Sequence, residues 1–365
     1  MPAETPPAIR PGATLGILGG GQLGRMLAAA AARLGLRSHV FCPDADCPAA
    51  DVAAARTVAA YEDEDALARF ADAVDAVTYE FENVPAASAA FLSARTCLRP
   101  NARALETAQD RLAEKRFLAG LGIPTAPFRP VGSEAELAAA LAELGAPAIL
   151  KTRRFGYDGK GQVRIAEGDR PGEAFAHLGG APAILEGVVP FSCEISVVAA
   201  RGVDGAFAAY EPCLNEHEGG ILAVTRLPAP LPEGVAALAT EAARAVADAL
   251  DYVGVLTVEM FVAVGPEGQP GVVVNEIAPR VHNSGHWTIE GAETSQFEQH
   301  VRAVCGWPLG PTDRLGAIEM RNLLGDAIAS FPQLLADPGA HPHHYGKGRP
   351  RPGRKMGHVT YVRRA

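Results

Sequence analysis

The sequence predicts an α/β protein with an N-terminal Rossmann-like domain built on a parallel sheet, a small α/β lid domain and a C-terminal α+β domain. Strand-like and helix-like runs alternate over the first third of the chain, a glycine-rich stretch follows a strand in the middle, and β-rich runs fill the rest. A chain of 365 residues is also too long for one ordinary core. We therefore expect three domains, at residues 1–112, 113–188 and 189–365.

The first domain begins with a buried strand, "ATLGILG", which leads through a glycine turn into an alanine- and leucine-rich helix over residues 22–35. The segments "RSHVFCPD" and "AVDAVTYEFENV" hold the second and third strands, and the third ends near Glu80. This β-α-β-α-β order implies a parallel sheet whose binding crevice lies at the carboxyl ends of its strands.

The lid domain is predicted from a helix over residues 106–122 that is stopped by Gly122, and from a second helix over 136–145. Its strands are expected at residues 147–154, 163–166 and 181–189. Beyond the lid, strand-like and helix-like segments follow at residues 194–201, 235–251, 254–264, 271–280 and 294–305.

The turn "GILGGGQLGRM" contains the spacing Gly19-x-Gly21-x-x-Gly24, which lets backbone N–H groups approach an anion at a helix N-terminus. Asp44 follows at the distance expected for an acid that binds a dinucleotide ribose. The turn is therefore compatible with a nicotinamide or flavin cofactor and equally with another anionic ligand. No later segment suggests a site for hydride transfer.

The stretch "ILKTRRFGYDGKGQ" places Lys151 at the end of a strand and follows it with a loop containing Gly156, Gly159 and Gly161. Such a loop can fold over phosphates while the lysine supplies a positive charge. It is not a Walker A motif, because no Gly-Lys-Ser/Thr follows. An ordinary hairpin with solvated basic residues is the alternative.

Two acids interrupt apolar strands. Glu259 lies in "LTVEMFV" and Glu276, next to Asn275, lies in "VVVNEIAPR". A buried carboxylate is costly unless it is paired, and two of them on adjacent strands suit Mg²⁺ that bridges nucleotide phosphates. Structural ion pairs with arginine are the alternative.

Two further polar segments indicate anion or substrate binding. "RVHNSGHWT" crowds together Arg280, His282, Asn283, Ser284 and His286. Near the end of the chain, "YGKGRPRPGRKMGHV" forms a basic, proline- and glycine-rich loop in an otherwise acidic protein. For any single histidine, a structural role is the simpler interpretation.

Composition narrows the class of protein. The formal net charge of −9 disfavours general nucleic-acid binding, and no apolar run approaches the ~20 residues that span a membrane. The first residues lack the order of a signal peptide, and the six cysteines form no CxxC pair or zinc spacing. We expect a reduced cytoplasmic protein that binds neither nucleic acid nor membranes.

The motifs "GILGGGQLGRM", "TYEFENV", "DRLAEK", "GYDGKGQ", "NEIAPRVHNSGHWT" and "RPGRKMGH" together resemble the ATP-grasp superfamily and, within it, the 5-(carboxyamino)imidazole ribonucleotide synthases. The resemblance covers almost the whole chain. It implies an ATP-dependent, biotin-independent carbon–nitrogen ligase of purine biosynthesis, which is a homodimer with ATP and Mg²⁺ as cofactors. Bicarbonate would attack the γ-phosphate to give carboxyphosphate, which then carboxylates 5-aminoimidazole ribonucleotide.

The resemblance also implies roles for individual residues. Arg111 and Lys151 would contact ATP phosphates, residues 156–162 would cover them, residues 186–189 would hold adenine and Glu194 would bind ribose. The implied ATP-binding residues are Arg111, Lys151, Gly156, Tyr157, Asp158, Gly159, Lys160, Gly161, Gln162, Glu186, Gly187, Val188, Val189, Glu194, His217, Asn275 and Glu276. The implied metal ligands are Glu259 and Glu276.

The ribonucleotide would lie beside the glycine turn, with Asp44 left as an ordinary acid at a strand end. Its implied ligands are Gly21, Gln22, Leu23, Glu80, Tyr157, Lys347, Arg354 and Lys355. The implied catalytic residues are Asp158, Arg280, Asn283 and Lys347. The alternatives are a formate-dependent glycinamide ribonucleotide transformylase, an NAD-dependent oxidoreductase and a non-catalytic nucleotide-binding regulator.

Overall fold

The computed structural model describes residues 8–156, 160–265 and 268–364. Its N-terminal sheet has the strand order β3-β2-β1-β4, and all of its pairs are parallel. The strands are β1 (Thr14–Leu18), β2 (Arg37–Cys42), β3 (Ala55–Val58) and β4 (Ala76–Tyr79). Helices α1 (Gln22–Arg33), α2 (Glu64–Asp72) and α3 (Ala86–Ser93) belong to the same region. The predicted parallel sheet is confirmed, and β1 and β4 are neighbours, so Gly19 and Glu80 meet at its carboxyl edge.

The single helix predicted over residues 106–122 is wrong, because the structure has two helices, α4 (Ala102–Gln109) and α5 (Arg111–Gly120). Asp110 separates them with an extended backbone (φ −124°, ψ 110°), and its carboxylate accepts hydrogen bonds from the Leu112 and Ala113 amides. Arg153 donates two further hydrogen bonds to this carboxylate, at 3.0 and 2.6 Å. Asp110 caps α5 and also pairs with Arg153, and these contacts break the helix at this residue although the periodicity of the segment favours a continuous one.

The second sheet is antiparallel, with the order β5-β8-β6-β7. Its strands are β5 (Phe128–Val131), β6 (Ala148–Thr152), β7 (Gln162–Ile165) and β8 (Ala183–Gly187). Helices α6 (Glu134–Leu144) and α7 (Pro171–His177) pack together against it, and Leu137, Leu150 and Leu185 lie in the shared core.

The remaining strands form one large antiparallel sheet with the path β14-β13-β9-β11-β12-β15-β17-β16 and β10 paired to β9. These strands are β9 (Phe191–Arg201), β10 (Phe207–Ala209), β11 (Cys213–Glu218), β12 (Ile221–Leu227), β13 (Gly254–Val264), β14 (Pro270–Ala278), β15 (Ala317–Leu324), β16 (Ala340–His344) and β17 (Lys355–Arg363). The associated helical segments are α8 (Val235–Ala249), η1 (Asn283–Gly285), α9 (Thr288–Gly291), α10 (Gln296–Val304), η2 (Gly325–Ser330) and α11 (Phe331–Ala336).

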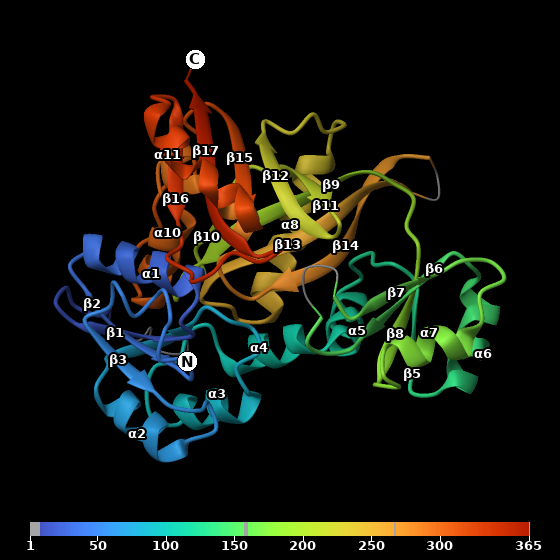
Figure 1. Cartoon of the computed structure of the whole chain (residues 1–365), viewed down its shortest axis with the longest axis horizontal. Helices are drawn as coiled ribbons and strands as arrows, with labels where there is room; N and C mark the ends of the chain where they lie inside the picture. The colour runs from blue at the N-terminus through green and yellow to red at the C-terminus, as the bar shows by residue number, and fades with distance from the viewer. Residues whose placement is uncertain (1–7, 157–159, 266–267, 365) are drawn as a thin grey trace.

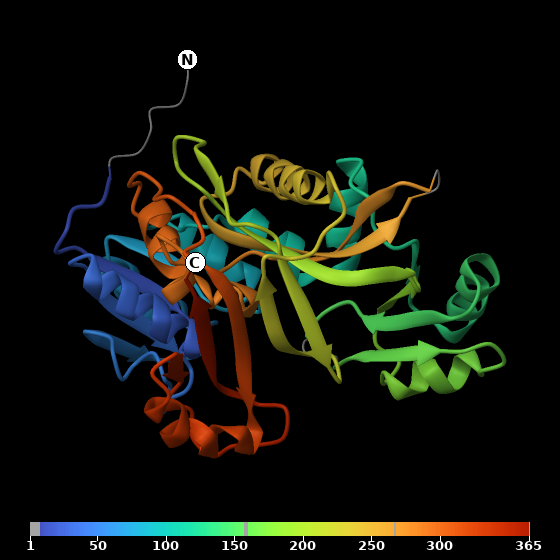
Figure 2. The ribbon, with the colours of Figure 1, turned by 90° about the horizontal axis from the view of Figure 1, so that it is seen from above.

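The large sheet connects the two smaller ones. Figures 1 and 2 show the parallel sheet and the small antiparallel sheet at opposite ends of the molecule, with the large sheet between them. Helix α8 packs on β9, β13 and β14, while α10 contacts both the large sheet and α1 of the parallel domain. Within the described residues, no helix is long and apolar enough to cross a membrane.

Candidate functional site

A cavity of about 700 Å³ opens where the three regions meet. It is lined by the glycine turn, the segment after β4, helix α5, the loop near Gly156, the end of β14 and the basic loop before β17. Of the residues predicted to act in the site, the lining includes Gly21, Gln22, Leu23, Glu80, Arg111, Gly156, Lys160, Glu276, Arg280, Asn283, Lys347, Arg354 and Lys355. Residues far apart in the sequence thus share one chamber.

A carboxyl group of the protein itself, that of Glu80, lies at the N-terminus of α1. The Glu80 carboxylate accepts hydrogen bonds from the amides of Gly21 at 2.8 Å and Gly24 at 3.2 Å. Gly19 has φ +110°, and a Cβ there would lie 2.5 Å from the Glu80 side chain, so only glycine fits. A carboxyl group of the protein thus takes two of the amides that the sequence offered to an external anion, and the role of the turn in substrate binding stays a prediction. Burial raises the pKa of Glu80, although both amide hydrogen bonds oppose this shift.

Next to Glu80, Glu82 forms an ion pair with Arg280 from the segment after β14. Burial alone would raise the pKa of Glu82, but the charge and the hydrogen bond of Arg280 outweigh it and hold that pKa below its ordinary value. Arg280 is thereby fixed at the cavity wall as a buried cation. The pairing joins two segments that are 198 positions apart, so sequence reasoning named Arg280 but missed Glu82.

A second charge cluster surrounds Glu186 at the end of β8. Lys151 Nζ lies 2.8 Å from one Glu186 oxygen, and Lys115 Nζ lies 3.7 Å from the other. Lys115 is only 1% exposed and also donates to the backbone oxygen of Asn275 at 2.9 Å. Lys115 thus connects the end of β8 to β14. The sequence offers only a weak signal for it, namely its place one turn after Arg111 in "DRLAEK".

Arg111 connects α5 to the sheet and to the glycine loop. Its guanidinium pairs with Glu276 at 3.0 Å and donates to the backbone oxygen of Gly156 at 3.2 Å. Nearby, Glu114 accepts a hydrogen bond from the Ile277 amide at 2.6 Å. Burial and then the charge of Glu276 raise the pKa of Glu114 to about 8. Glu114, which sequence reasoning also missed, therefore lies beside Arg111 and Glu276 as an acid whose surroundings favour its protonated form.

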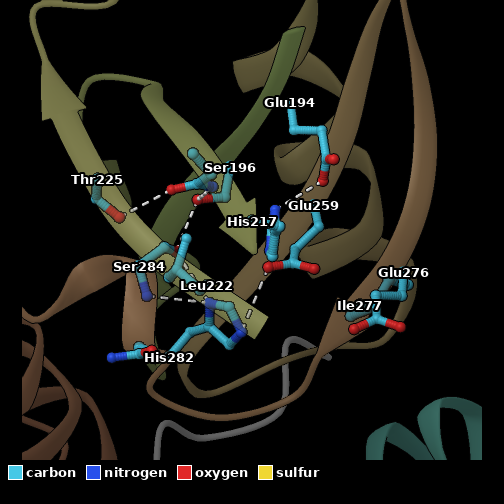
Figure 3. A network of polar contacts seen from close by, with 12 residues as sticks. Glu194, Ser196, His217, Leu222, Thr225, Glu259, Glu276, Ile277, His282 and Ser284 are labelled. Carbon is cyan, nitrogen blue, oxygen red and sulfur yellow. Dashed lines mark hydrogen bonds and ion pairs between the residues drawn. The ribbon is translucent and has the colours of Figure 1, made fainter. Parts of the chain in front are cut away.

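Glu259 and Glu276 are register partners on the neighbouring strands β13 and β14. His282 Nε2 lies 3.4 Å from Glu259, and Figure 3 shows the imidazole of His217 close by, 3.0 Å from Glu194. Burial and then the proximity of Glu276 raise the pKa of Glu259 to about 7. Among the described residues, no three histidine, cysteine or acidic side chains are arranged to hold a metal ion by themselves. A cation held by Glu259 and Glu276 would therefore need further ligands of another kind, such as an amide oxygen, a phosphate or water.

The basic loop, residues 346–355, also lines the cavity. Lys347 lies 5.7 Å from the centre of the Tyr345 ring, and Arg354 donates to the backbone oxygen of Arg349 at 3.0 Å. Arg351 lines the same wall. Asn283 exchanges two side-chain hydrogen bonds with Asn322 at 2.9 and 2.8 Å, which fixes its amide at the cavity edge.

The other predicted residues lie around this chamber rather than along its lining. Lys151 lies in β6, one residue before its end, and Glu186 and Gly187 end β8, while Glu194 and His217 face each other from β9 and β11. Gly161 and Gln162 lead into β7, and Val188 and Val189 follow β8. Tyr157, Asp158 and Gly159 lie outside the described residues.

Comparison with known proteins places this site in a family. The profile of the ribonucleotide synthetase preATP-grasp domain matches residues 12–109, and that of the ATP-grasp domain matches residues 116–297. The phosphoribosylaminoimidazole carboxylase C-terminal domain matches residues 319–365. The N5-carboxyaminoimidazole ribonucleotide synthase of Brucella melitensis biotype 1 is 51% identical over 358 residues, which cover 98% of both chains.

The chain belongs to the N5-carboxyaminoimidazole ribonucleotide synthase family. The family resemblance predicted from the motifs is therefore confirmed, as is the predicted fold class. Neither the transformylase nor the NAD-dependent oxidoreductase is supported.

Solved structures of N5-carboxyaminoimidazole ribonucleotide synthases share the whole architecture. The enzyme from Thermus thermophilus is 49% identical with a TM-score of 0.88, covering 96% of this chain and 93% of its own. The enzyme from Aspergillus clavatus, in complex with ADP and 5-aminoimidazole ribonucleotide, is 31% identical with a TM-score of 0.89. That match covers 97% of this chain and 94% of the fungal one.

Proposed function

We propose that this protein carboxylates the exocyclic amine of 5-aminoimidazole ribonucleotide, using ATP and bicarbonate and releasing ADP and phosphate, in purine biosynthesis. The observation that carries the proposal is the match to N5-carboxyaminoimidazole ribonucleotide synthases along 98% of the chain. The cavity supports it, because its lining joins the glycine loop to the basic loop in one chamber. Relatives bind the two expected partners, since the Aspergillus clavatus enzyme was solved with ADP and the ribonucleotide.

The proposed reaction has two steps. A bicarbonate oxygen attacks the γ-phosphorus of ATP, the bond to ADP breaks, and carboxyphosphate forms. The substrate amine then attacks the carboxyl carbon, the bond from that carbon to the phosphate oxygen breaks, and phosphate leaves. The amine loses a proton, for which Asp158 is our proposed acceptor. Phosphoryl transfer of this kind depends mainly on positioning and charge neutralisation.

The nucleotide end supplies those charges. We propose that Arg111 and Lys151 contact the phosphates and that residues 156–162 cover them, excluding water from carboxyphosphate. Here Lys151 is paired with Glu186 and Arg111 with Glu276, so ATP would compete with carboxylates that already hold these cations in place. Adenine would lie against residues 186–189, and the ribose would lie near Glu194 and His217.

The carboxylate pair fits Mg²⁺. Glu259 and Glu276 present oxygen ligands from adjacent strands, with Asn275 beside them. Mg²⁺ is commonly held by one or two carboxylates together with substrate phosphates and water, which agrees with the lack of a larger ligand cluster among the described residues. When bound, the cation would neutralise phosphate charge. We expect E259Q and E276Q each to abolish ADP release, and near-normal turnover in either variant would remove its metal role.

The substrate end faces the parallel sheet. We propose that Gly21, Gln22, Leu23 and Glu80 contact the sugar side of the ribonucleotide. Its phosphate would meet Lys347, Arg354 and Lys355, with Tyr157 nearby. Arg280, Asn283 and Lys347 would hold bicarbonate or carboxyphosphate. The support is that these described side chains line one cavity, with Arg280 fixed by Glu82 and Asn283 by Asn322.

We also propose domains at residues 1–112, 113–188 and 189–365, in line with the three sheets. A cytoplasmic homodimer is proposed from the family resemblance.

The proposed function is tested by measuring ADP release with MgATP alone, with bicarbonate, and with bicarbonate plus 5-aminoimidazole ribonucleotide. We expect rapid release only in the complete mixture, with one carboxylated product per ADP. If the ribonucleotide gave neither stimulation nor product, the substrate assignment would fall, even if ATP bound.

A further inference from the structure

A chain of buried hydrogen bonds starts inside the large sheet and runs towards Glu259 (Figure 3). The Thr225 hydroxyl on β12 lies 2.9 Å from Asn215 Oδ1, and Asn215 Nδ2 donates to Ser196 Oγ at 2.9 Å. Ser196 Oγ lies 2.7 Å from Ser284 Oγ. Thr225, Ser196 and Ser284 are fully buried and Asn215 is 5% exposed, so each polar group needs a partner in the protein.

The chain continues through an imidazole to the predicted metal ligand. Ser284 Oγ lies 2.9 Å from His282 Nδ1, and His282 Nε2 lies 3.4 Å from a Glu259 oxygen. None of the four residues upstream of His282 lines the cavity. The hydrogen-bond path from their side chains to Glu259 therefore passes through His282.

The direction of this chain is fixed by groups that can only donate or only accept. Asn215 Oδ1 can only accept, so it accepts from Thr225, and Asn215 Nδ2 can only donate, so it donates to Ser196. Ser196 therefore accepts from Asn215 and gives its own hydrogen to Ser284, because the sulfur of Cys213, 3.1 Å away, is only a weak acceptor. Ser284 is left to donate to His282 Nδ1.

A second donor independently requires the same tautomer. The backbone amide of Ser284 donates to His282 Nδ1 at 3.3 Å, so this nitrogen must carry a lone pair. A neutral imidazole then carries its hydrogen on Nε2, which lies 3.4 Å from a carboxyl oxygen of Glu259. The opposite tautomer would place a lone pair against the carboxylate and would leave two donors facing an N–H.

We propose that Thr225, Asn215, Ser196 and Ser284 are positioning residues that hold His282 in the Nε2–H tautomer and thereby orient the Glu259 carboxylate. One Glu259 oxygen accepts from His282, and the other remains directed to the cation. The link to catalysis rests on the proposed function, but the tautomer does not. Partners of this kind behind a metal site commonly change activity by about 10- to 100-fold when removed.

The direct test is ¹⁵N NMR of histidine-labelled, ligand-free protein, in which protonated and unprotonated ring nitrogens resonate far apart. We expect His282 to show a protonated Nε2 and an unprotonated Nδ1, with its signals assigned by comparison with H282Q. In S284A the backbone amide of residue 284 remains as a donor to Nδ1, so we expect a minor population of the Nδ1–H tautomer to appear, and a smaller one in the near-isosteric T225V. If wild-type His282 carried its hydrogen on Nδ1, the proposal would be overturned.

Kinetics supply the second readout. We expect S284A to lower kcat about 10- to 100-fold with little change in the KM for the ribonucleotide, and T225V to lower it less. The matched controls are T360V, whose buried hydroxyl has no hydrogen-bond partner among the described residues, and S88A, which lies in the parallel domain. Both should keep the wild-type tautomer and kcat.

The tautomer and kcat of the variants together distinguish a failure of the positioning role from a failure of the proposed function. Loss of kcat in S284A and T225V with an unchanged His282 tautomer would refute the positioning role, as would a changed tautomer with wild-type kcat. If S284A failed to fold, T225V would decide the matter alone. A wild-type protein that kept the Nε2–H tautomer but never carboxylated the ribonucleotide would refute the proposed function while leaving the tautomer assignment intact.

Discussion

Lys115 offers a sharp test of how the lid is attached to the large sheet. It is 1% exposed, and its ammonium lies 3.7 Å from Glu186 and donates to the Asn275 oxygen at 2.9 Å. Replacement by methionine keeps most of the side-chain volume but removes the charge and the donor. The variant K115M therefore isolates the polar contribution of this residue.

The magnitude follows from the contacts that are lost. Removing one partner of a buried ion pair costs about 3–5 kcal/mol, but Glu186 keeps Lys151 at 2.8 Å, so we take less than the lower bound, about 2 kcal/mol. The Asn275 oxygen loses a buried donor, which adds about 1 kcal/mol. We expect a total of about 3 kcal/mol, or a fall in Tm of about 4 °C for a chain of 365 residues.

The assay is thermal unfolding of K115M with and without MgATP, together with the KM for ATP. Since Glu186 belongs to residues 186–189, which we propose to hold adenine, we expect the KM for ATP to rise while the KM for the ribonucleotide stays near wild type. R116M is the matched control, because Arg116 is the next residue of α5 and is exposed. If K115M had the same Tm as R116M and an unchanged KM for ATP, the proposed link through Lys115 between the end of β8 and the large sheet would be refuted.

Three further predictions concern other contacts. D110A should destabilise the protein by about 1–2 kcal/mol in thermal unfolding through loss of the α5 cap, and D110N should recover much of this; equal losses would contradict the capping role. Burial lowers the pKa of His217, but the neighbouring Glu194 outweighs this and raises it above 6.5, so the contact stabilises fully below pH 6.5 and less as pH rises through the folded pKa. The Tm difference between wild type and E194Q should accordingly shrink from pH 6.5 upward, and a pH-independent difference would argue against the pair. K347M and R354M should raise the KM for the ribonucleotide more than that for ATP, and equal effects would count against phosphate binding by the basic loop.

Local sequence signals predicted a large part of the fold. The strand before Gly19 and the helix after it follow from periodicity and glycine spacing, and the apolar runs around Glu259 and Glu276 mark β13 and β14. These features depend on neighbours within a few residues, so they can be read without the fold. The break at Asp110 could not, because it depends partly on Arg153, which approaches from β6.

In the site too, some residues could be predicted from their own segments and others could not. Arg280, Lys347 and the strand acids carry their chemistry in their own segments, whereas Glu82, Glu114 and Lys115 gain theirs from partners more than 70 positions away. The Glu80 carboxylate is the clearest case. The glycine turn predicts an anion at the helix N-terminus, but only the pairing of β1 with β4 shows that the Glu80 carboxyl group accepts the hydrogen bond of the Gly21 amide.

The central claim, carboxylation through carboxyphosphate in this cavity, is tested most directly by the fate of bicarbonate oxygen. Bicarbonate labelled with ¹⁸O should be supplied with MgATP and 5-aminoimidazole ribonucleotide, and the released phosphate should be analysed by mass spectrometry. Our account predicts one labelled oxygen per phosphate and labelled oxygen in the product carboxylate. Unlabelled phosphate released together with carboxylated product would contradict it.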